Sequence, residues 1–326
     1  MNRILVIQTS FIGDVILATS VVEKLHQFYP SASIDFLVRK GNEALLDGHP
    51  FLNRVWVWDK QSGKYSNLLK LSREIKAQSY DLVVNVHRFA ASGYLTWTSQ
   101  AKERSGFAKN PFSFSYTRKV KHEIGNGKHE IERNQELIQP WTDEKPLPPR
   151  LYPTEKHVQK VQAYQNDPYV VIAPASVWFT KQLPTEKWAE LIASLNPDLK
   201  VHFIGAPQDR DTAQVIIDRA GIEDRAINLA GELSLMESTA LMQKATMNYV
   251  NDSAPLHLAS SVDAPVTAFF CSTVPRFGFG PSGTQGKVAE TEEKLDCRPC
   301  GLHGKKECPQ QHFKCATTLP VKKFAV

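Results

Sequence analysis

The sequence contains no apolar run that approaches the roughly 20 residues a transmembrane helix needs. Its first ten residues, MNRILVIQTS, lack the charged-then-apolar plan of a secretory signal peptide and are typical of a buried strand. We therefore expect a cytoplasmic protein.

Strong charge of either sign is also missing. A net charge of +5 in 326 residues is too weak to indicate a nucleic-acid-binding protein. It fits an anionic substrate, or a loose association with acidic lipid headgroups. The length is long for one core and predicts two domains.

Two nucleotide-binding signatures are absent as well. Neither half of the chain has the G-x-G-x-x-G of a dinucleotide-binding fold, and G-x-x-x-x-G-K-[ST] does not occur. NAD-dependent enzymes and P-loop NTPases are therefore excluded.

What the sequence does contain is a regular alternation of short apolar runs and helical patterns. In the first half, strands are expected at residues 4–7, 34–38, 55–58 and 81–86, and helices after residue 13, over 68–78 and after 87. Strands alternating with helices predict a parallel sheet covered on both faces.

Five prolines lie within residues 140–153, which predicts a stiff connector between domains 1–152 and 153–326. A second alternating set follows, with strands at 169–173, 200–205, 226–230 and around 247–251 and 265–270. The sequence thus predicts an α/β protein with two Rossmann-like halves facing each other across a cleft.

Two turns carry candidate chemistry because ligands of open α/β sheets lie beyond the carboxyl ends of strands. Asp14 follows the first strand and is either a helix N-cap or a general base. Asp252 and Ser253 precede a helix with Pro255 in its first turn. The free N–H groups there suit a phosphate, although the two residues could simply cap the helix.

A basic, aromatic segment at residues 102–128 is either a solvated loop region or a surface for an anionic, amphiphilic acceptor. His87 and Arg88 follow a predicted strand and are candidate acceptor contacts, although a lone histidine is more often structural.

Four of the five cysteines form C-x2-C-x7-C-x6-C, at Cys297, Cys300, Cys308 and Cys315. Such spacing in a cytosolic protein favours a structural Zn²⁺ site, and reduced thiols or a disulfide are the alternatives. Cys271 is expected to be a packing residue.

Several motifs together resemble the ADP-heptose:lipopolysaccharide heptosyltransferases of glycosyltransferase family 9. They are ILVIQTSFIGDVILATSVV, APASVWFTKQLPTEKW, GAPQDRD, NLAGELSL, NDSAPLHLASS and FGFGPSG, in that order. The resemblance implies the GT-B fold. It also implies inverting transfer of heptose from ADP-heptose to a lipopolysaccharide inner-core acceptor, without a catalytic metal, at the cytoplasmic face of the inner membrane.

The resemblance also implies roles for matching residues. Asp14 would be the general base, kept ionised by the helix dipole, and Lys181 would neutralise the leaving diphosphate. Further donor contacts would come from Gly13, Ser176, Asp209 at the ribose, Leu233 at the adenine, and the turn of Asp252, Ser253, Ala254 and His257.

Two positions depart from the family pattern. Gln182 stands where an arginine is usual, and Ala254 replaces a glycine. One lost cation should weaken diphosphate binding, and alanine is tolerable if residue 254 is helical. Two other readings remain open: a GT-B nucleotide-sugar 2-epimerase, and a catalytically idle nucleotide-binding module.

Overall fold

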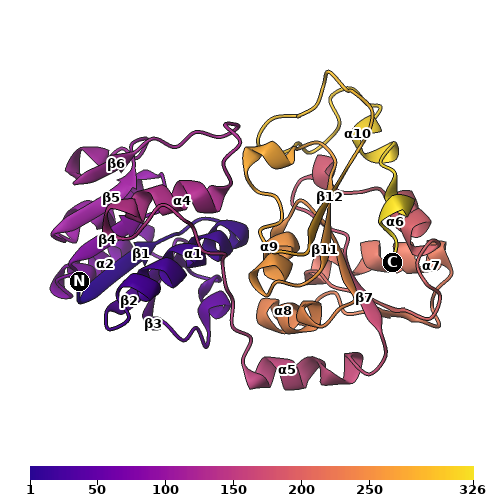
Figure 1. Cartoon of the computed structure of the whole chain (residues 1–326), viewed down its shortest axis with the longest axis horizontal. Coiled ribbons are helices and arrows are strands. Elements are labelled where there is room, and N and C mark those ends of the chain that lie inside the picture. Colours follow the sequence, from indigo (N-terminus) through magenta and orange to yellow (C-terminus); the bar gives the residue numbers. More distant parts are fainter. The chain divides into compact units, whose positions relative to one another are not determined.

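The computed structural model describes residues 1–326, which form two compact units, Met1–Tyr152 and Pro153–Val326. Each unit contains one six-stranded parallel sheet with helices packed around it (Figure 1). None of the helices combines the length and apolarity needed to cross a membrane.

The first unit has the strand order β3-β2-β1-β4-β5-β6. Its strands are β1 (Arg3–Ile7), β2 (Ser33–Arg39), β3 (Leu52–Trp58), β4 (Leu82–Asn85), β5 (Glu103–Phe107) and β6 (Arg118–Val120). Its helices are α1 (Ile12–Phe28), α2 (Lys64–Ala77), α3 (Ala90–Thr98) and α4 (Glu130–Ile138). The apolar run of β1 is fully buried, because helices cover both faces of a parallel sheet.

The second unit has the strand order β12-β11-β10-β7-β8-β9. Its strands are β7 (Tyr169–Ala173), β8 (Lys200–Phe203), β9 (Ala226–Asn228), β10 (Met247–Asn251), β11 (Val266–Phe270) and β12 (Gly286–Glu290). Its helices are α5 (Glu155–Val161), α6 (Thr185–Ile192), α7 (Arg210–Ala220), α8 (Leu235–Gln243), α9 (Ala254–Ser261) and α10 (Lys314–Thr317). Trp188 of α6 packs edge-on against Phe269 in the centre of this core.

The last residues of the chain pack on the second unit. A 3-10 turn over Val321–Phe324 lies against α6, and the hydroxyl of Tyr249 donates to the carbonyl of Phe324 at 2.8 Å. This places the cysteine-rich residues between β12 and α10 on the same unit.

The structure adds strands that periodicity did not reveal. The basic segment 102–128, for which one reading was a solvated loop region, contains β5 and β6. Strand β5 reads ERSGF and has little apolar signal, yet Ser105, Gly106 and Phe107 are buried. Gly106 is required there because a Cβ would lie 2.3 Å from the ring of Tyr116.

The glycine pattern of a dinucleotide-binding fold does occur once in the sequence, contrary to the expectation from the sequence. Residues 278–283, GFGPSG, do match the glycine spacing of G-x-G-x-x-G. They lie between a 3-10 turn over Pro275–Phe277 and strand β12, however, and no helix follows them. The segment therefore lacks the helix N-terminus that holds a pyrophosphate in dinucleotide-binding folds.

Candidate active site

Asp14 lies in the first turn of α1, directly beyond the carboxyl end of β1. The hydroxyl of Ser10 donates to its carboxylate at 2.7 Å. Burial raises the pKa of Asp14 above its usual value, and nearby Glu130 adds to the rise, whereas the Ser10 hydrogen bond and Arg88 oppose it. The helix position led us to expect an ionised Asp14, whereas burial, the largest effect on its pKa, favours the protonated carboxyl group.

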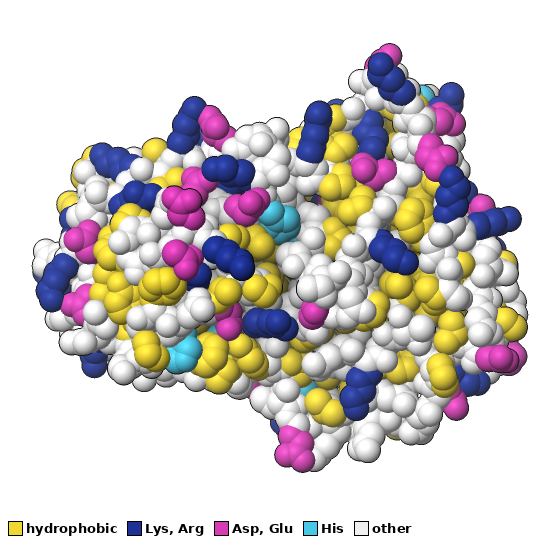
Figure 2. Space-filling model, viewed as in Figure 1, with side chains coloured by type: hydrophobic (Ala, Val, Ile, Leu, Met, Phe, Trp, Pro, Cys, Tyr) yellow, Lys and Arg dark blue, Asp and Glu magenta, His cyan; other side chains and the backbone are white.

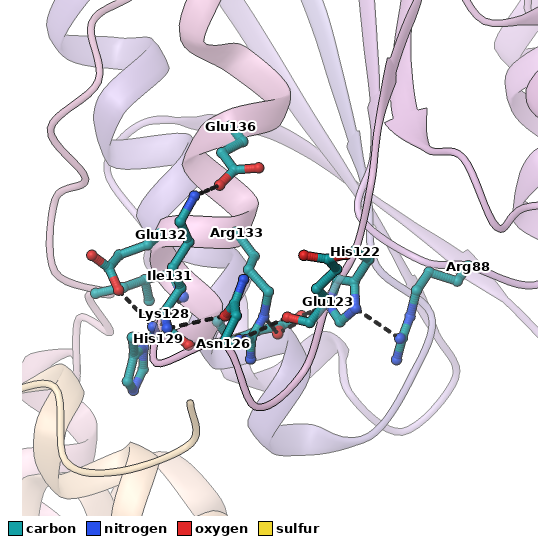
Figure 3. Close-up of polar contacts among 11 residues, drawn as sticks. Arg88, His122, Glu123, Asn126, Lys128, His129, Ile131, Glu132, Arg133 and Glu136 are labelled. Carbon is teal, nitrogen blue, oxygen red and sulfur yellow. Dashed lines mark hydrogen bonds and ion pairs between the residues drawn. The ribbon is translucent and has the colours of Figure 1, made fainter. Parts of the chain in front are cut away.

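Arg88, His122, Glu130 and Arg133 of the same unit form a hydrogen-bonded network, part of which is shown in Figure 3. The charges of Glu130 and Arg88 both act on the pKa of Asp14. The guanidinium of Arg88, after β4, is 3.0 Å from Nδ1 of His122, which follows β6. Nε2 of His122 is 3.0 Å from the carboxylate of Glu130, and Arg133 donates to that carboxylate at 2.6 Å. Glu130 and Arg133 are one turn apart on α4, whose start is capped by His129.

The hydrogen bonds to Arg88 and Glu130 fix the tautomer of His122. A guanidinium can only donate hydrogen bonds, so Nδ1 of His122 accepts from Arg88 and the ring proton lies on Nε2, toward Glu130. Burial works to raise the pKa of Glu130, but His122 and Arg133 outweigh it and the pKa is lowered. Glu130 therefore stays ionised, and His122 holds Arg88 in place.

His87 lies on the neighbouring turn because β1 and β4 are paired directly. Its Nδ1 is 3.1 Å from the hydroxyl of Thr9, and the ammonium of Lys60 donates to the carbonyl of Thr9 at 2.7 Å. Burial lowers the pKa of His87 to about 4, with the charges of Lys60 and Arg88 adding to the effect. His87 is therefore neutral and buried, whereas Arg88 is only partly buried.

The second unit gathers three loops at the carboxyl ends of β7, β10 and β11, which are adjacent in the sheet. The ammonium of Lys181 lies 2.7 Å from Oδ2 of Asp252, and the hydroxyl of Thr273 donates to the same oxygen at 2.6 Å. The Lys181 and Asp252 side chains are only 15% and 9% exposed. Asp252 thus engages these two groups rather than serving only as a helix cap.

Helix α9 begins at Ala254, with Ser253 at the N-cap and Pro255 in the first turn. Ser253 makes no side-chain cap hydrogen bond, so the N–H groups of the first turn have no side-chain cap. Ala254 is helical, which is the condition under which alanine was expected to be tolerated. His257 is buried within the same helix.

Gln182, at the position of the expected arginine, has a defined local role. Its amide donates to the carbonyl of Ser176 at 2.6 Å. Asn251, which is fully buried, accepts from the backbone N–H of Leu183 at 3.0 Å and donates to the carbonyl of Pro174 at 2.7 Å. These bonds tie both ends of the Lys181 loop, and Asn251 carried no sequence signal beyond its place at a strand end.

The two residues expected at the nucleoside have different surroundings. Asp209 is the N-cap residue of α7, but its carboxylate accepts from the backbone N–H of Ala206 at 2.8 Å and makes no cap bond to α7. Leu233 is only half-buried and lies outside the core, so core packing does not account for it.

The candidate residues thus form two groups, one in each unit. Ser10, Asp14, Lys60, Arg88 and His122 belong to the first unit. Sequence reasoning missed Lys60, His122 and Glu130. The only available signal was weak: Lys60 follows an expected strand in VWVWDK, and His122 lies in the basic segment.

The cysteine segment, residues 297–315, contains only free thiols. Cys297, Cys300 and Cys308 are partly exposed, whereas Cys315 and Cys271 are buried. Cys271 therefore is a packing residue, as expected. No three His, Cys, Asp or Glu side chains of the chain are arranged to hold a metal ion, so the zinc site predicted from spacing is not formed in this structure.

Comparison with known proteins relates the chain to one enzyme family. Residues 68–309 match the family model described as glycosyltransferase family 9 (heptosyltransferase). The chain is 29% identical over 282 residues to lipopolysaccharide heptosyltransferase 3 of Escherichia coli, covering 80% of each. It is 25% identical over 327 residues to lipopolysaccharide heptosyltransferase 1 of Pseudomonas aeruginosa, covering 95% of this chain and 88% of that one.

Solved structures show the same fold. A family 9 glycosyltransferase from Veillonella parvula superposes with a TM-score of 0.79 at 23% identity, covering 88% of this chain and 84% of that one. E. coli ADP-heptose LPS heptosyltransferase II gives 0.77 at 19% identity, covering 96% of each. E. coli heptosyltransferase WaaC with ADP gives 0.72 at 22% identity, covering 88% and 92%. The predicted two-domain GT-B fold class is thereby confirmed.

The lowered pKa of His87 predicts a specific acid sensitivity. Between pH 6.5 and about 4 the unfolded chain binds a proton that neutral His87 in the fold does not, so stability falls as the pH falls through this window. The loss amounts to about 3 kcal/mol. Urea titrations at pH 7 and pH 4.5 should show a smaller loss for His87→Asn than for the native chain. Exposed His303→Asn is the control, and equal losses in all three proteins would contradict the assignment.

Proposed function

This chain belongs to glycosyltransferase family 9, the heptosyltransferases, and on that premise we propose that it transfers a heptose from ADP-heptose to a lipopolysaccharide inner-core sugar or a related cell-surface glycan. The donor follows from the similar enzymes, one named an ADP-heptose heptosyltransferase and another solved with ADP. The observation that carries the chemistry is Asp14, a carboxylate of raised pKa at a strand end.

On the donor side, Lys181 and the N–H groups at the start of α9 would receive the diphosphate. The ammonium of Lys181 has three donors, and the ion pair with Asp252 occupies one of them. The remaining donors can bind phosphate oxygens, where negative charge grows as the bond from the anomeric carbon to the diphosphate breaks. We propose that these groups, with contacts from Gly13, Ser176 and His257, meet that charge without a catalytic metal.

On the acceptor side, Asp14 would remove the proton from the acceptor hydroxyl as its oxygen attacks the anomeric carbon. A single displacement of this kind inverts the anomeric configuration, and the proton ends on the Asp14 carboxylate. A raised pKa makes Asp14 a stronger base than an ordinary aspartate. Arg88, held by His122, and His87 are the proposed acceptor contacts.

At the nucleoside, we propose that Asp209 binds the ribose hydroxyls and Leu233 contacts the adenine. Only Oδ2 of Asp209 is engaged by Ala206, so Oδ1 can accept a hydroxyl. The partial exposure of Leu233 leaves apolar surface for a ring.

Asp14→Asn tests the proposed mechanism. An amide cannot take the proton, so transfer from ADP-heptose should fall by about 10³-fold or more, whereas ADP affinity should change less than about twofold. Product formation and calorimetric ADP titration measure the two quantities. Asp47→Asn, an exposed carboxylate of the same unit, is the control. Transfer that survives Asp14→Asn rules out this base.

The same assay separates the alternatives. An epimerase would convert the donor sugar with no acceptor present. In a catalytically idle module, the native protein itself would bind ADP and transfer no sugar. The family match favours the transferase over both.

We further propose that the first unit binds the cytoplasmic face of the inner membrane, where a lipid-linked acceptor resides. Residues 1–152 contain 21 Lys and Arg against 15 Asp and Glu, and residues 153–326 contain 18 against 19. The net positive charge therefore belongs to the first unit, whose visible face in Figure 2 shows apolar patches with Lys and Arg, and also Asp and Glu, around them.

An aromatic cluster on the first unit supports membrane binding. Trp97 of α3 stacks with Phe112 at 5.8 Å between ring centroids, and Phe114 and Tyr94 contact the same pair. Trp97 is 47% and Phe114 is 66% exposed. Amphipathic aromatic rings of this kind prefer the headgroup region of a bilayer.

Vesicle sedimentation tests this surface. The native chain should bind vesicles containing phosphatidylglycerol more strongly than neutral ones, and salt should weaken the binding. Replacing Trp97 and Phe114 by Ala should lower the affinity by about tenfold, since each loses buried ring area. Tyr65→Ala, an exposed aromatic on α2, is the control. Equal binding by all variants would contradict the proposal.

We also propose that the cysteine segment can take up one structural Zn²⁺. Sγ of Cys297 lies 3.8 Å from Nε2 of His312, and the remaining thiols would have to move together to complete a tetrahedral site. Purified protein should then contain one equivalent of zinc that Cys297→Ser loses. Purified protein without zinc, or a melting temperature that does not change when chelator or zinc is added, would contradict this proposal.

A further inference from the structure

The cysteine segment lies directly against the loop that carries Lys181. The backbone N–H of Thr180 donates to the carbonyl of Lys305 at 3.1 Å, and the N–H of Lys305 donates to the hydroxyl of Thr180 at 2.7 Å. Thr180 is 1% exposed, and its hydroxyl also accepts from Ser272 at 3.0 Å. The residue next to Lys181 is thus held from both its backbone and its side chain.

A second contact reaches the Lys181 side chain itself. Gly304 has a φ of +80°, and a Cβ there would lie 2.9 Å from Cγ of Lys181 and 3.1 Å from the hydroxyl of Thr180. The backbone of the cysteine segment therefore packs on the base of the lysine stem. Phe313, farther along the segment, stacks on Phe179 at 5.2 Å between ring centroids.

Arg298, also in the cysteine segment, acts on Asp252, the ion-pair partner of Lys181, through the loop after β11. The Arg298 guanidinium donates to the carbonyls of Phe270, Cys271 and Thr273 at 2.7–2.9 Å. It also pairs with Glu290 at 2.5 Å. This closes the end of β11 and sets the position of Thr273, whose hydroxyl donates to Asp252, which pairs with Lys181.

The ends of the segment are fixed independently of these contacts. The N–H of Cys300 donates to the carbonyl of Ser272 at 2.8 Å, and Cys315 is buried in the core of the second unit. A segment anchored at both ends can hold a loop packed against its middle.

We infer that the cysteine segment is a positioning element of the donor site, which sets the place of the Lys181 ammonium through Gly304, Lys305 and Arg298. The inference rests on the proposed role of Lys181 toward the diphosphate. It gives the cysteine segment a function in catalysis that does not depend on a bound metal.

Two glycines of the segment provide a matched pair of variants. Gly304→Ala and Gly301→Ala both place a side chain at positive φ, +80° and +87°, so they impose a similar backbone strain. Only Gly304 has Lys181 and Thr180 within reach, whereas nothing lies within 4 Å of a Cβ at Gly301. A difference in ADP affinity or hydrogen exchange between the two variants therefore reports the contact of Gly304 with Lys181 and Thr180.

Gly304→Ala should weaken ADP binding by about tenfold, the size of one lost polar contact. Amide hydrogen exchange in residues 178–182 should be faster by a similar factor. Gly301→Ala should leave both within about twofold of the native chain. Identical behaviour of the two variants, or faster exchange with unchanged ADP affinity, would overturn the inference.

Lys181→Ala separates this result from a failure of the proposed function. If Lys181→Ala binds ADP normally, the role of the lysine is wrong, whatever the exchange data show. Should Gly304→Ala not fold, Thr180→Val removes the hydroxyl that Lys305 and Ser272 contact, and Thr180→Ser keeps it. Weaker ADP binding by the valine variant alone supports the inference, and equal binding by both overturns it.

Discussion

The ion pair between Lys181 and Asp252 is the interaction on which the second unit's candidate site depends. It joins the loop after β7 to the start of α9, and Thr273 adds the loop after β11. A pair this buried costs desolvation and does not by itself prove stability. Its consequence is geometric: a flexible lysine is held at one point, so a diphosphate would meet a cation that is already ordered.

In the first unit, too, a cationic side chain is held in place by buried polar neighbours. Arg88 is held by Nδ1 of His122, and Nε2 of His122 contacts Glu130, which Arg133 also pairs with. The buried Glu130 carboxylate is tolerated because Arg133 pairs with it and His122 also contacts it. Asp14 therefore lies near both signs of charge, and burial has the larger effect on its pKa.

The sequence could reveal those parts of the molecule that local rules determine. Apolar runs and turn residues located most strands, and Asp14, Lys181 and Asp252 could be placed because each follows such a run. Strand β5 escaped because its burial comes from tertiary packing around Gly106 and Ser105. His122, Lys60 and Asn251 escaped because their roles depend on partners distant in sequence, which no spacing rule encodes. The zinc prediction rested on the spacing of the thiols alone, which does not encode the contacts that the backbone of the segment makes with the Lys181 loop.

The uneven exposure of the five thiols has a practical consequence. Cys271 and Cys315 are shielded, whereas Cys297, Cys300 and Cys308 reach solvent within the segment that borders Lys181. An environment-sensitive maleimide dye would label this border in the unaltered chain, without an introduced cysteine. If the proposed role of Lys181 holds, the dye's fluorescence would report nucleotide occupancy in real time, because the labelled backbone shares hydrogen bonds with the Lys181 loop.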